Sequence, residues 1–338
     1  MDAVQGAGAR LLTSRFARTL APPRWLTVSC ANRARFDFSS PHVQNRNPVA
    51  DEYKLVQLRN GAQAVYSAHY DEKMHPGLGP AAEAELLYVW QLKIPERMHE
   101  GAGEFVVWDV GLGAAANAIA VLRATREISR PLRVVSFDDT AGPLAFALDN
   151  ADTLGYLRGY ETAGKALLEG GQTQFSDGVR DVNWEFHLGD FPAWLAAACE
   201  DTRPTNAVLP PPHAIMFDAF SPAKNPAMWT LPLFTNFFRR LDPTRPCNLT
   251  TYSRSTMFRV TLLLAGFFVG RGVATGLKEE TTVAANTLAL LDEPLDHIWL
   301  ERARRSDSAE PLHTPTYGRN QLSPASLEKL QAHSQFSA

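Results

Sequence analysis

One stretch of the chain, FDAFSPAKNPAMW at 217–229, gathers the side chains best suited to chemistry. It follows an apolar run that predicts a buried strand, and it offers a carboxylate at Asp218, an aromatic ring at Phe220 and polar groups at Lys224 and Asn225. In an open α/β sheet, ligands bind beyond the carboxyl ends of the strands, where this loop would lie. The pattern predicts a binding or catalytic site. The alternative is a proline-punctuated turn in which Asp218 caps the next helix.

Three further acidic residues stand near the ends of predicted strands. Asp109 comes two residues before Gly111 and four before Gly113, while Asp138 and Asp190 follow the next two strands. Glycines at a strand-to-helix turn let the backbone approach a ligand closely. The spacing also fits the G-x-G-x-x-G/A fingerprint of dinucleotide-binding proteins, so a nicotinamide cofactor stays open. A carboxylate at this turn would repel a pyrophosphate but attract the cationic amino-acid end of S-adenosylmethionine, which we therefore favour.

Each of these acids has its own expected role. Asp109 would receive the amino group of the cofactor, and Asp138 would bind both ribose hydroxyls. Asp190 would lie near the adenine amino group, with Phe191 against the adenine ring. The alternative for all three is helix capping, because Asp is a preferred N-cap residue. Three acids at three successive strand ends favour a shared ligand site.

The elements that would position these residues alternate between strand and helix. Such alternation predicts a parallel, doubly wound α/β sheet with right-handed crossovers. The last two strands follow one another directly, so one of them must be antiparallel. A sheet of seven strands with the last one reversed is the order of class I (Rossmann-like) S-adenosylmethionine-dependent methyltransferases. Before the sheet, the Asn60-Gly61 turn predicts a hairpin over residues 53–68, and residues 158–180 predict an insertion loop. The predicted strands cover 105–110, 132–137, 184–188, 214–217, 248–252, 267–274 and 282–291, and the predicted helices cover 81–91, 143–157, 192–200, 231–241 and 257–265, with another that ends near 124.

Composition limits the class of protein. Of the 338 residues, 45% are hydrophobic and 20% are charged, as in a soluble globular protein. No apolar run approaches the ~20 residues that span a membrane. The cysteines Cys30, Cys199 and Cys247 match no zinc or disulfide spacing, so we expect a reducing, cytoplasmic setting and no metal.

Charge divides the chain into a basic beginning and an acidic remainder. The first 36 residues hold six arginines and one acidic residue, which leaves −8 for the rest of a chain whose net charge is −3. We interpret residues 1–45 as a disordered tail, although a transit peptide or translation from an upstream start codon would have the same composition. We expect a methyltransferase domain with its hairpin extension at 50–300 and a peripheral tail at 301–338. The acidic body argues against binding of nucleic acid, which usually requires a basic surface.

These motifs resemble a known family, the methyltransferase domain of the tRNA 5-methylaminomethyl-2-thiouridine biosynthesis protein MnmC, in a stand-alone form without the flavin domain. DAFSPAKNPAMW at 218–229 resembles the family's D-G-F-A-P-x-K-N-P-x-M-W almost residue for residue. WDVGLGAAAN at 108–117 resembles its E-T-G-F-G-T-G-x-N more loosely. Three shorter matches are SFDD at 136–139 for S-F-E-K, LTTYS at 249–253 for L-A-T-F-T, and GLGPAAEA at 77–84 for G-L-x-E-T.

The resemblance covers about residues 50–290 and implies methylation of an aminomethyl group on the wobble uridine of tRNA. Asp218 would face the reacting amine and accept its proton. Phe220 would stack on a flipped-out base, as aromatic residues of single-stranded RNA readers do, whereas for Trp229 we expect core packing. The predicted substrate-binding residues are Phe220, Lys224, Asn225, Tyr252 and Glu83.

The chain departs from the family near its C-terminal end. The family's basic G-F-G-x-K-R-E-M segment corresponds to residues 276–282, where Glu279 and Glu280 stand in place of cations. The acceptor would then be a different amine, or tRNA would bind through other basic residues, for which the candidates are Arg239, Arg240, Arg254 and Arg259. A further hypothesis is a non-catalytic module that binds cofactor or RNA without turnover, and a nicotinamide oxidoreductase is the last.

Overall fold

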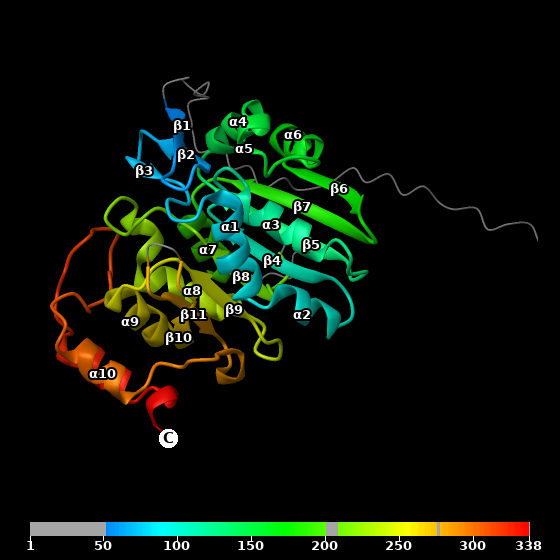
Figure 1. Ribbon diagram of the computed structural model, residues 1–338. Coiled ribbons are helices and arrows are strands. Elements are labelled where there is room, and N and C mark those ends of the chain that lie inside the picture. Colours follow the sequence, from blue (N-terminus) through cyan, green and yellow to red (C-terminus); the bar gives the residue numbers. More distant parts are fainter. Residues whose placement is uncertain (1–51, 201–208, 276–277, 338) are drawn as a thin grey trace, which may run out of the picture. The chain divides into compact units, whose positions relative to one another are not determined.

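The computed structural model describes residues 52–200, 209–275 and 278–337, so the predicted tail at 1–45 lies outside the described residues. An eight-stranded sheet runs through the described chain in the order β10-β11-β9-β8-β4-β5-β7-β6 (Figure 1). Strands β7, β5, β4, β8 and β9 are parallel, and β11 is antiparallel to both β9 and β10. The predicted sheet, mostly parallel with a reversed last strand, is confirmed. The strands are β4 (Phe105–Val110), β5 (Leu132–Asp138), β6 (Gln172–Asp177), β7 (Arg180–Leu188), β8 (Ala214–Phe217), β9 (Asn248–Thr251), β10 (Phe268–Gly272) and β11 (Thr281–Ala285).

The eighth strand, β6, corrects the expectation of an insertion loop at 158–180. This segment forms helix α6 (Glu161–Gly170) and then β6, which pairs antiparallel with β7. Two glycines make the turns: Gly171 ends the helix at φ +70° and Gly178 closes the hairpin at φ +62°. Residues of β6 alternate between exposed and partly buried, as an edge strand with one face in water does. The glycines interrupt the helical and strand periodicities, and the segment therefore looked irregular in sequence.

Helices cover both faces of the sheet because strand side chains alternate between the faces. On β4, Val106, Trp108 and Val110 pack in a core cluster with helices α7, α8 and α9. Phe105 and Val107 pack in a second cluster, with α1, α3, α4, α6 and the π-helix η1. All of β4 is buried, as a central parallel strand must be. The helices are α1 (Pro80–Ala84), η1 (Glu85–Trp90), α2 (Ile94–His99), α3 (Ala116–Thr125), α4 (Gly142–Asp149), α5 (Ala151–Leu154), α7 (Phe191–Glu200), α8 (Leu231–Arg240) and α9 (Thr256–Ala265).

A separate three-stranded sheet precedes the core. The predicted hairpin is confirmed, with β1 (Tyr53–Gln57) and β2 (Gln63–Ser67) antiparallel around a turn in which Gly61 has φ +85°. A short strand, β3 (Glu72–Lys73), pairs with β2. It belongs to residues 69–79, which we call the strap. The helix predicted after the strap at 81–91 is in fact α1 followed by η1, and such π-helical turns are frequent at functional sites.

The C-terminal segment, expected to be peripheral, packs into the core. Leu312, Leu330 and Phe336 belong to the cluster that contains α8 and α9. The Gln335 amide accepts a hydrogen bond from the N–H of Val269 and donates to its carbonyl, both at 2.8 Å, so it covers backbone groups of the edge strand β10. The segment contains α11 (Pro324–Gln331) and the short 3₁₀ turn η4 (Ser334–Phe336), and it follows the 3₁₀ turn η3 (Leu288–Leu290) and helix α10 (His297–Arg304), whose last turn it includes.

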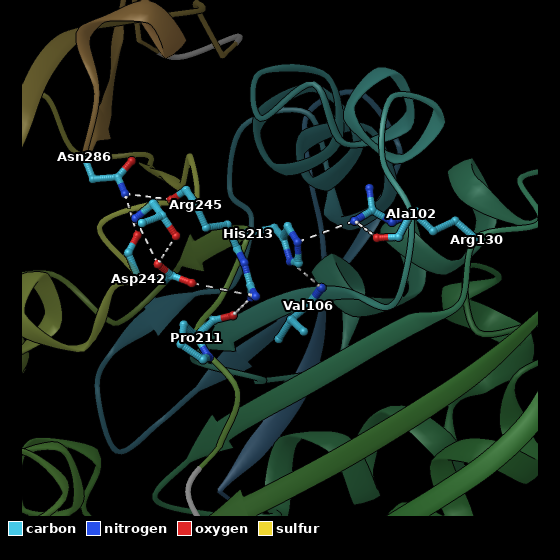
Figure 2. Close-up of polar contacts among 9 residues, drawn as sticks. Ala102, Val106, Arg130, Pro211, His213, Asp242, Arg245 and Asn286 are labelled. Atoms are coloured by element: carbon cyan, nitrogen blue, oxygen red, sulfur yellow. Dashed lines mark hydrogen bonds and ion pairs between the residues drawn. The ribbon is translucent and has the colours of Figure 1, made fainter.

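Arginine side chains hold the loops at the amino ends of the central strands by hydrogen bonds to backbone carbonyls (Figure 2). His213, which immediately precedes β8, accepts a hydrogen bond from the N–H of Val106 at its Nδ1, over 2.9 Å. Arg130 donates to three backbone carbonyls near the start of β4, and Arg245 donates to the carbonyl of Pro211 at 2.8 Å. These guanidinium groups satisfy carbonyls that the strands leave unpaired. We therefore assign this cluster to stability of the fold.

Candidate active site

Asp218 lies one residue beyond the end of β8, at the carboxyl edge of the sheet. Its N–H donates to the carbonyl of Val110 at 2.9 Å, which continues the pairing of β8 with β4. Asn117, in the first turn of α3, donates from Nδ2 to Oδ2 of Asp218 at 2.9 Å, and His75 Nε2 lies 3.7 Å from the same oxygen. Within the described 209–275 segment, the first helix after Asp218 is a short 3₁₀ helix that begins at Pro226, and its N-cap residue is Asn225. The structure therefore does not support the alternative in which Asp218 is a helix cap.

The glycine turn after β4 contacts the Asp218 backbone directly. Gly111 has φ +94°, and a Cβ there would lie 2.7 Å from the carbonyl oxygen of Asp218, so a larger residue does not fit. Gly113 has φ +51° and donates its N–H to Asp138 Oδ2 at 2.8 Å. Helix α3 follows with Ala115 at its N-cap and no side-chain cap. The free N–H groups of that first turn suit an anionic group such as a carboxylate.

Asp109 is completely buried behind this turn. Its Oδ2 accepts a hydrogen bond from Ser136 Oγ at 2.8 Å, and Ser136 accepts one from Trp184 Nε1 at 3.0 Å. Burial raises the pKa of Asp109 to about 8, against the hydrogen bond from Ser136, and the charge of Asp218 adds to the rise. Within the described residues, neither Asp109 Oδ1 nor Asn117 Oδ1 has a hydrogen-bond partner. Two buried acceptors without donors, in a field of carboxylates, fit the ammonium group of S-adenosylmethionine.

Asp138 ends β5 and lies on the opposite side of the glycine turn from Asp218. Burial and then the neighbouring Asp139 raise the pKa of Asp138 to about 7, although the N–H groups of Gly113 and Thr140 donate to it and lower that pKa. Asp139 Oδ2 accepts a hydrogen bond from the hydroxyl of Tyr70 on the strap, at 3.0 Å. Asp138 keeps free lone pairs for a second donor, so its predicted role toward ribose hydroxyls stays a prediction.

Asp190 acts as a helix cap, as its alternative interpretation held. Its Oδ1 accepts the N–H of Ala193 at 2.9 Å, at the start of α7, and the residue is exposed. Phe191 is buried, with its ring 4.7 Å from that of Phe137 and 5.8 Å from that of Trp194 between centroids. The expectation that Phe191 lies against adenine is therefore wrong, because the ring packs in the core. A contact from Asp190 to adenine stays a prediction.

The loop after Asp218 is fixed from inside and from the strap. Trp229 is buried, as predicted, and its Nε1 donates to the carbonyl of Phe220 at 2.8 Å. Asn225 occupies the N-cap position of η2 (Pro226–Trp229) without a side-chain cap bond. Lys224 Nζ lies 3.5 Å from Asp71 Oδ2 on the strap, with both side chains largely exposed. The predicted substrate residues Phe220, Lys224 and Asn225 thus share one loop beside Asp218.

Tyr252 and Glu83 arrive from other elements. Tyr252, just after β9, donates its hydroxyl to the carbonyl of Ala219 at 2.9 Å. Lys278 Nζ lies 4.0 Å above the Tyr252 ring and donates to the Tyr252 carbonyl at 3.1 Å. Glu83, buried in α1, accepts the N–H of Gly77 at 3.1 Å. Burial lowers the pKa of Lys278, whereas the charges of Glu83 and Asp218 raise it, so both carboxylates are near its ammonium group.

The acidic residues that depart from the family pattern are paired within the protein. Glu280 lies 2.9 Å from Arg259 and 3.6 Å from Arg271. Glu279 lies 3.5 Å from Arg254. Arg259 is 2% exposed, so it cannot be one of the surface residues through which tRNA would bind. Glu280 neutralises this buried guanidinium, which would otherwise be costly to bury.

Sequence reasoning missed several side chains around Asp218. Tyr88, in η1, donates its hydroxyl to the carbonyl of Phe217 at 3.4 Å, and burial followed by the charge of Asp218 raises the pKa of Tyr88 far above its usual value. His75 reaches Asp218 from a backbone with φ +53°. Asn117 stood in a motif that had been recognised, but its role depends on the direction in which α3 points. The others come from more than a hundred residues away, which no local spacing can indicate.

Membrane-spanning helices and metal clusters are both absent from the described ranges. None of the helices there has the length and apolar character needed to cross a bilayer. Nor do the described His, Cys, Asp and Glu side chains form any group of three or more that could hold a metal ion.

Comparison with known proteins agrees with this geometry. Residues 193–287, which include Asp218 and its loop, match a family model described as S-adenosyl-L-methionine-dependent methyltransferase. Two curated relatives are the tRNA 5-methylaminomethyl-2-thiouridine biosynthesis bifunctional proteins MnmC of Cupriavidus metallidurans, 27% identical over 226 residues, and of Vibrio cholerae, 23% identical over 241 residues. Each match covers 65% of this chain but only about a third of the relative, 32% and 33% respectively.

Among solved structures, MNMC2 from Aquifex aeolicus has a similar fold, with a TM-score of 0.60, 20% identity and 85% coverage of each chain. The resemblance to the methyltransferase part of MnmC is therefore confirmed. So are the fold class, the enzyme class of S-adenosylmethionine-dependent methyltransferase, and the cofactor.

Proposed function

We propose that this S-adenosylmethionine-dependent methyltransferase transfers its methyl group to the nitrogen of an aminomethyl group on the wobble uridine of tRNA. The observation that carries the proposal is the carboxylate of Asp218, held by Asn117 at 2.9 Å beside the glycine turn. The similarity to MnmC, whose name states a role in tRNA 5-methylaminomethyl-2-thiouridine biosynthesis, supports this acceptor. The chain spans about a third of those relatives, so their acceptor is inferred for it.

Binding of the cofactor would use the groups around the glycine turn. The unpaired Oδ1 atoms of Asp109 and Asn117 would accept from its ammonium group, and Asp138 from its ribose hydroxyls. Gly111 and Gly113 would let it approach the backbone. When bound, the cofactor would supply a methyl group bonded to a sulfonium sulfur, open to in-line attack by a nucleophile with a thioether as leaving group.

The protein would prepare the attacking nitrogen. An alkylammonium has no lone pair, so a proton must leave before the nitrogen can attack. Asp218 would accept that proton, since it lies at the edge of the site with its carboxylate fixed by Asn117. Glu72 and Glu83 add negative charge nearby, and both contribute to the raised pKa of Tyr252, whose largest cause is burial. Such a site favours a cationic amine over a neutral or anionic acceptor.

A second candidate is methylation of a small cationic amine. Exposed cations at the rim of the site have acidic neighbours: Lys224 has Asp71, and Arg254 has Glu279. This pairing weakens the positive field that a phosphate backbone requires. The non-catalytic hypothesis is disfavoured by the Asp218 carboxylate, which Asn117 holds beside the glycine turn and which cofactor binding alone would not require.

The test is transfer of labelled methyl from S-adenosylmethionine to tRNA that lacks the final wobble methylation. Wild-type protein should label this tRNA. Asp218→Asn should reduce kcat by about 100-fold or more, the usual range for loss of a general base, while cofactor binding persists. Asp149→Asn, an exposed substitution, should leave the rate unchanged. If the wild type binds cofactor yet leaves tRNA unlabelled, the tRNA acceptor is refuted and small amines become the substrates to examine.

A further inference from the structure

The strap makes several contacts to the loop that follows β8. Three of its residues reach that loop: Asp71 pairs with Lys224 at 3.5 Å, Glu72 accepts the Ser221 N–H at 3.2 Å and also its hydroxyl, and His75 lies 3.7 Å from Asp218. The strap also reaches the glycine turn, because a Cβ on Gly113 would lie 3.5 Å from Met74 Sδ. The strap therefore touches both the predicted cofactor side and the predicted acceptor side.

Tyr70 joins these two sides through one side chain. Its hydroxyl donates to Asp139 Oδ2 at 3.0 Å, next to Asp138 at the end of β5. Its ring stacks on Phe220, with centroids 4.0 Å apart and planes at 20°. Burial and then the charge of Asp139 raise the pKa of Tyr70 well above its usual value, so the hydroxyl stays protonated as a donor.

Phe220 in turn is held in a fixed relation to Asp218. The two residues are separated by Ala219, whose carbonyl accepts the Tyr252 hydroxyl at 2.9 Å. The carbonyl of Phe220 accepts Trp229 Nε1 at 2.8 Å, from the core side. The carbonyls of Ala219 and Phe220 are thus both held by hydrogen bonds, so the Phe220 ring and Asp218 belong to one short, restrained segment of backbone.

We propose that Tyr70 is a positioning residue that makes the acceptor loop respond to cofactor bound at Asp138. This inference rests on the proposed function for the identity of the cofactor site. A ligand that fixes Asp138 also fixes its neighbour Asp139, and the Tyr70 hydroxyl carries that restraint to the stacked Phe220 ring. The acceptor loop, with Asp218 at its start, is then more ordered when cofactor is present. By linkage, cofactor and acceptor would each raise the affinity of the protein for the other.

Hydrogen exchange measures this coupling without any methyl acceptor. Exchange of the backbone amides at 218–229 would be followed with and without S-adenosylhomocysteine, in the full-length wild type and in Tyr70→Phe, which keeps the ring but removes the hydroxyl. We expect the ligand to slow exchange of this segment about tenfold in the wild type and less than twofold in Tyr70→Phe. Tyr66→Phe is the matched control, because Tyr66 donates to Asp71 on the same strap and should leave the coupling intact.

Two internal measurements separate the role of Tyr70 from damage to the fold or the site. Exchange at 105–110, in β4, should be the same in all three proteins, which shows that the core is intact. Titration calorimetry with S-adenosylhomocysteine should show binding to Tyr70→Phe, so that ligand is present when exchange is measured. Equal protection of 218–229 in Tyr70→Phe and the wild type, or no protection in the wild type despite binding, would overturn the inference. Absence of tRNA methylation alongside preserved coupling would refute only the acceptor that we propose.

Discussion

Replacement of Asp109 by Asn should stabilise the protein at neutral pH while weakening cofactor binding. The folded-state pKa is about 8 and the ordinary value is 3.8, so between these values the folded protein holds a proton that the unfolded chain has released. Wild-type stability therefore falls as pH rises through this window, by about 1.4 kcal/mol per unit and by roughly 4 kcal/mol from pH 4 to pH 7. The Asp109→Asn side chain does not ionise, so the variant does not lose this stability as pH rises.

The amide introduced by Asp109→Asn would have its own cost. One of its groups can pair with Ser136, but the other would occupy the position of Oδ1, which has no partner among the described residues. The wild-type carboxyl has the same unpaired atom, so only the second N–H of the amide adds a cost, of about 1 kcal/mol. The net gain at pH 7 is therefore about 3 kcal/mol, and at pH 4 the variant should be about 1 kcal/mol less stable than the wild type. The two stability curves should therefore cross between pH 4 and pH 7.

Urea unfolding followed at several pH values between 4 and 8 gives these curves directly, and calorimetry with S-adenosylmethionine gives the binding. The Asp109→Asn variant should bind roughly 10- to 150-fold more weakly, the range for a lost hydrogen bond to a charged group. Asp149→Asn, at an exposed position of α4, serves as the control and should follow the wild type in both assays. Parallel stability curves for Asp109→Asn and the wild type would refute the reasoning, because they would show that Asp109 ionises equally in both states.

Two further predictions concern the glycine turn and the amino edge of the sheet. Gly111→Ala should lower the free energy of unfolding in urea by about 2 kcal/mol or more and reduce methyl transfer, because its Cβ would lie 2.7 Å from the Asp218 carbonyl. The control is Gly103→Ala, where φ is +72° and no described atom lies within 4 Å of the added Cβ. This control should show only the smaller cost of placing alanine at a positive φ. Burial and then Arg245, Arg130 and Arg97 lower the pKa of His213 to about 3, so the unfolded chain binds the additional proton between pH 3 and 6.5. The contribution of neutral His213 to stability is therefore fully present above pH 6.5 and is lost on acidification. The His213→Asn side chain can still accept a hydrogen bond from the N–H of Val106 but does not titrate. This variant should therefore show a weaker dependence of the free energy of unfolding on pH between 3 and 6.5.

The sequence predicted the central strands β4 and β8 well because nearly all of their residues are apolar. β4 and β8 are buried along their whole lengths, so their composition identifies them without neighbours. The same reasoning missed β6, an edge strand whose polar residues face water, and the C-terminal segment, whose few apolar residues are widely spaced. Periodicity detects elements that bury a continuous face. It fails where single side chains such as Phe336 make the contact.

The site was only partly predictable, for a related reason. Asp218 and Gly111 lie at the ends of strands that the sequence identifies, so topology alone brings them together. Tyr70 and His75 lie on the strap, and their positions depend on how a separate three-stranded sheet packs over the carboxyl edge. Asp190 occupies the expected strand end, and its carboxylate accepts the N–H of Ala193 at the start of α7. Its contact with adenine stays a prediction.

Charge is the property that sequence represents least well, and the acceptor question depends on it. Glu279 and Glu280 argued against tRNA as long as they counted as free negative charges in place of cations. In the fold, Glu280 neutralises Arg259, which is buried, and therefore adds no net field at the surface. The choice of acceptor depends instead on two sets of charges, the exposed cations at the rim of the site and the carboxylates beside Asp218. The inner acids select a cationic nitrogen at short range, whereas attraction of a phosphate backbone depends on rim residues such as Lys224, which screening by salt weakens. A tRNA acceptor therefore requires that methyl transfer fall steeply with salt, while transfer to a small amine would be nearly independent of it.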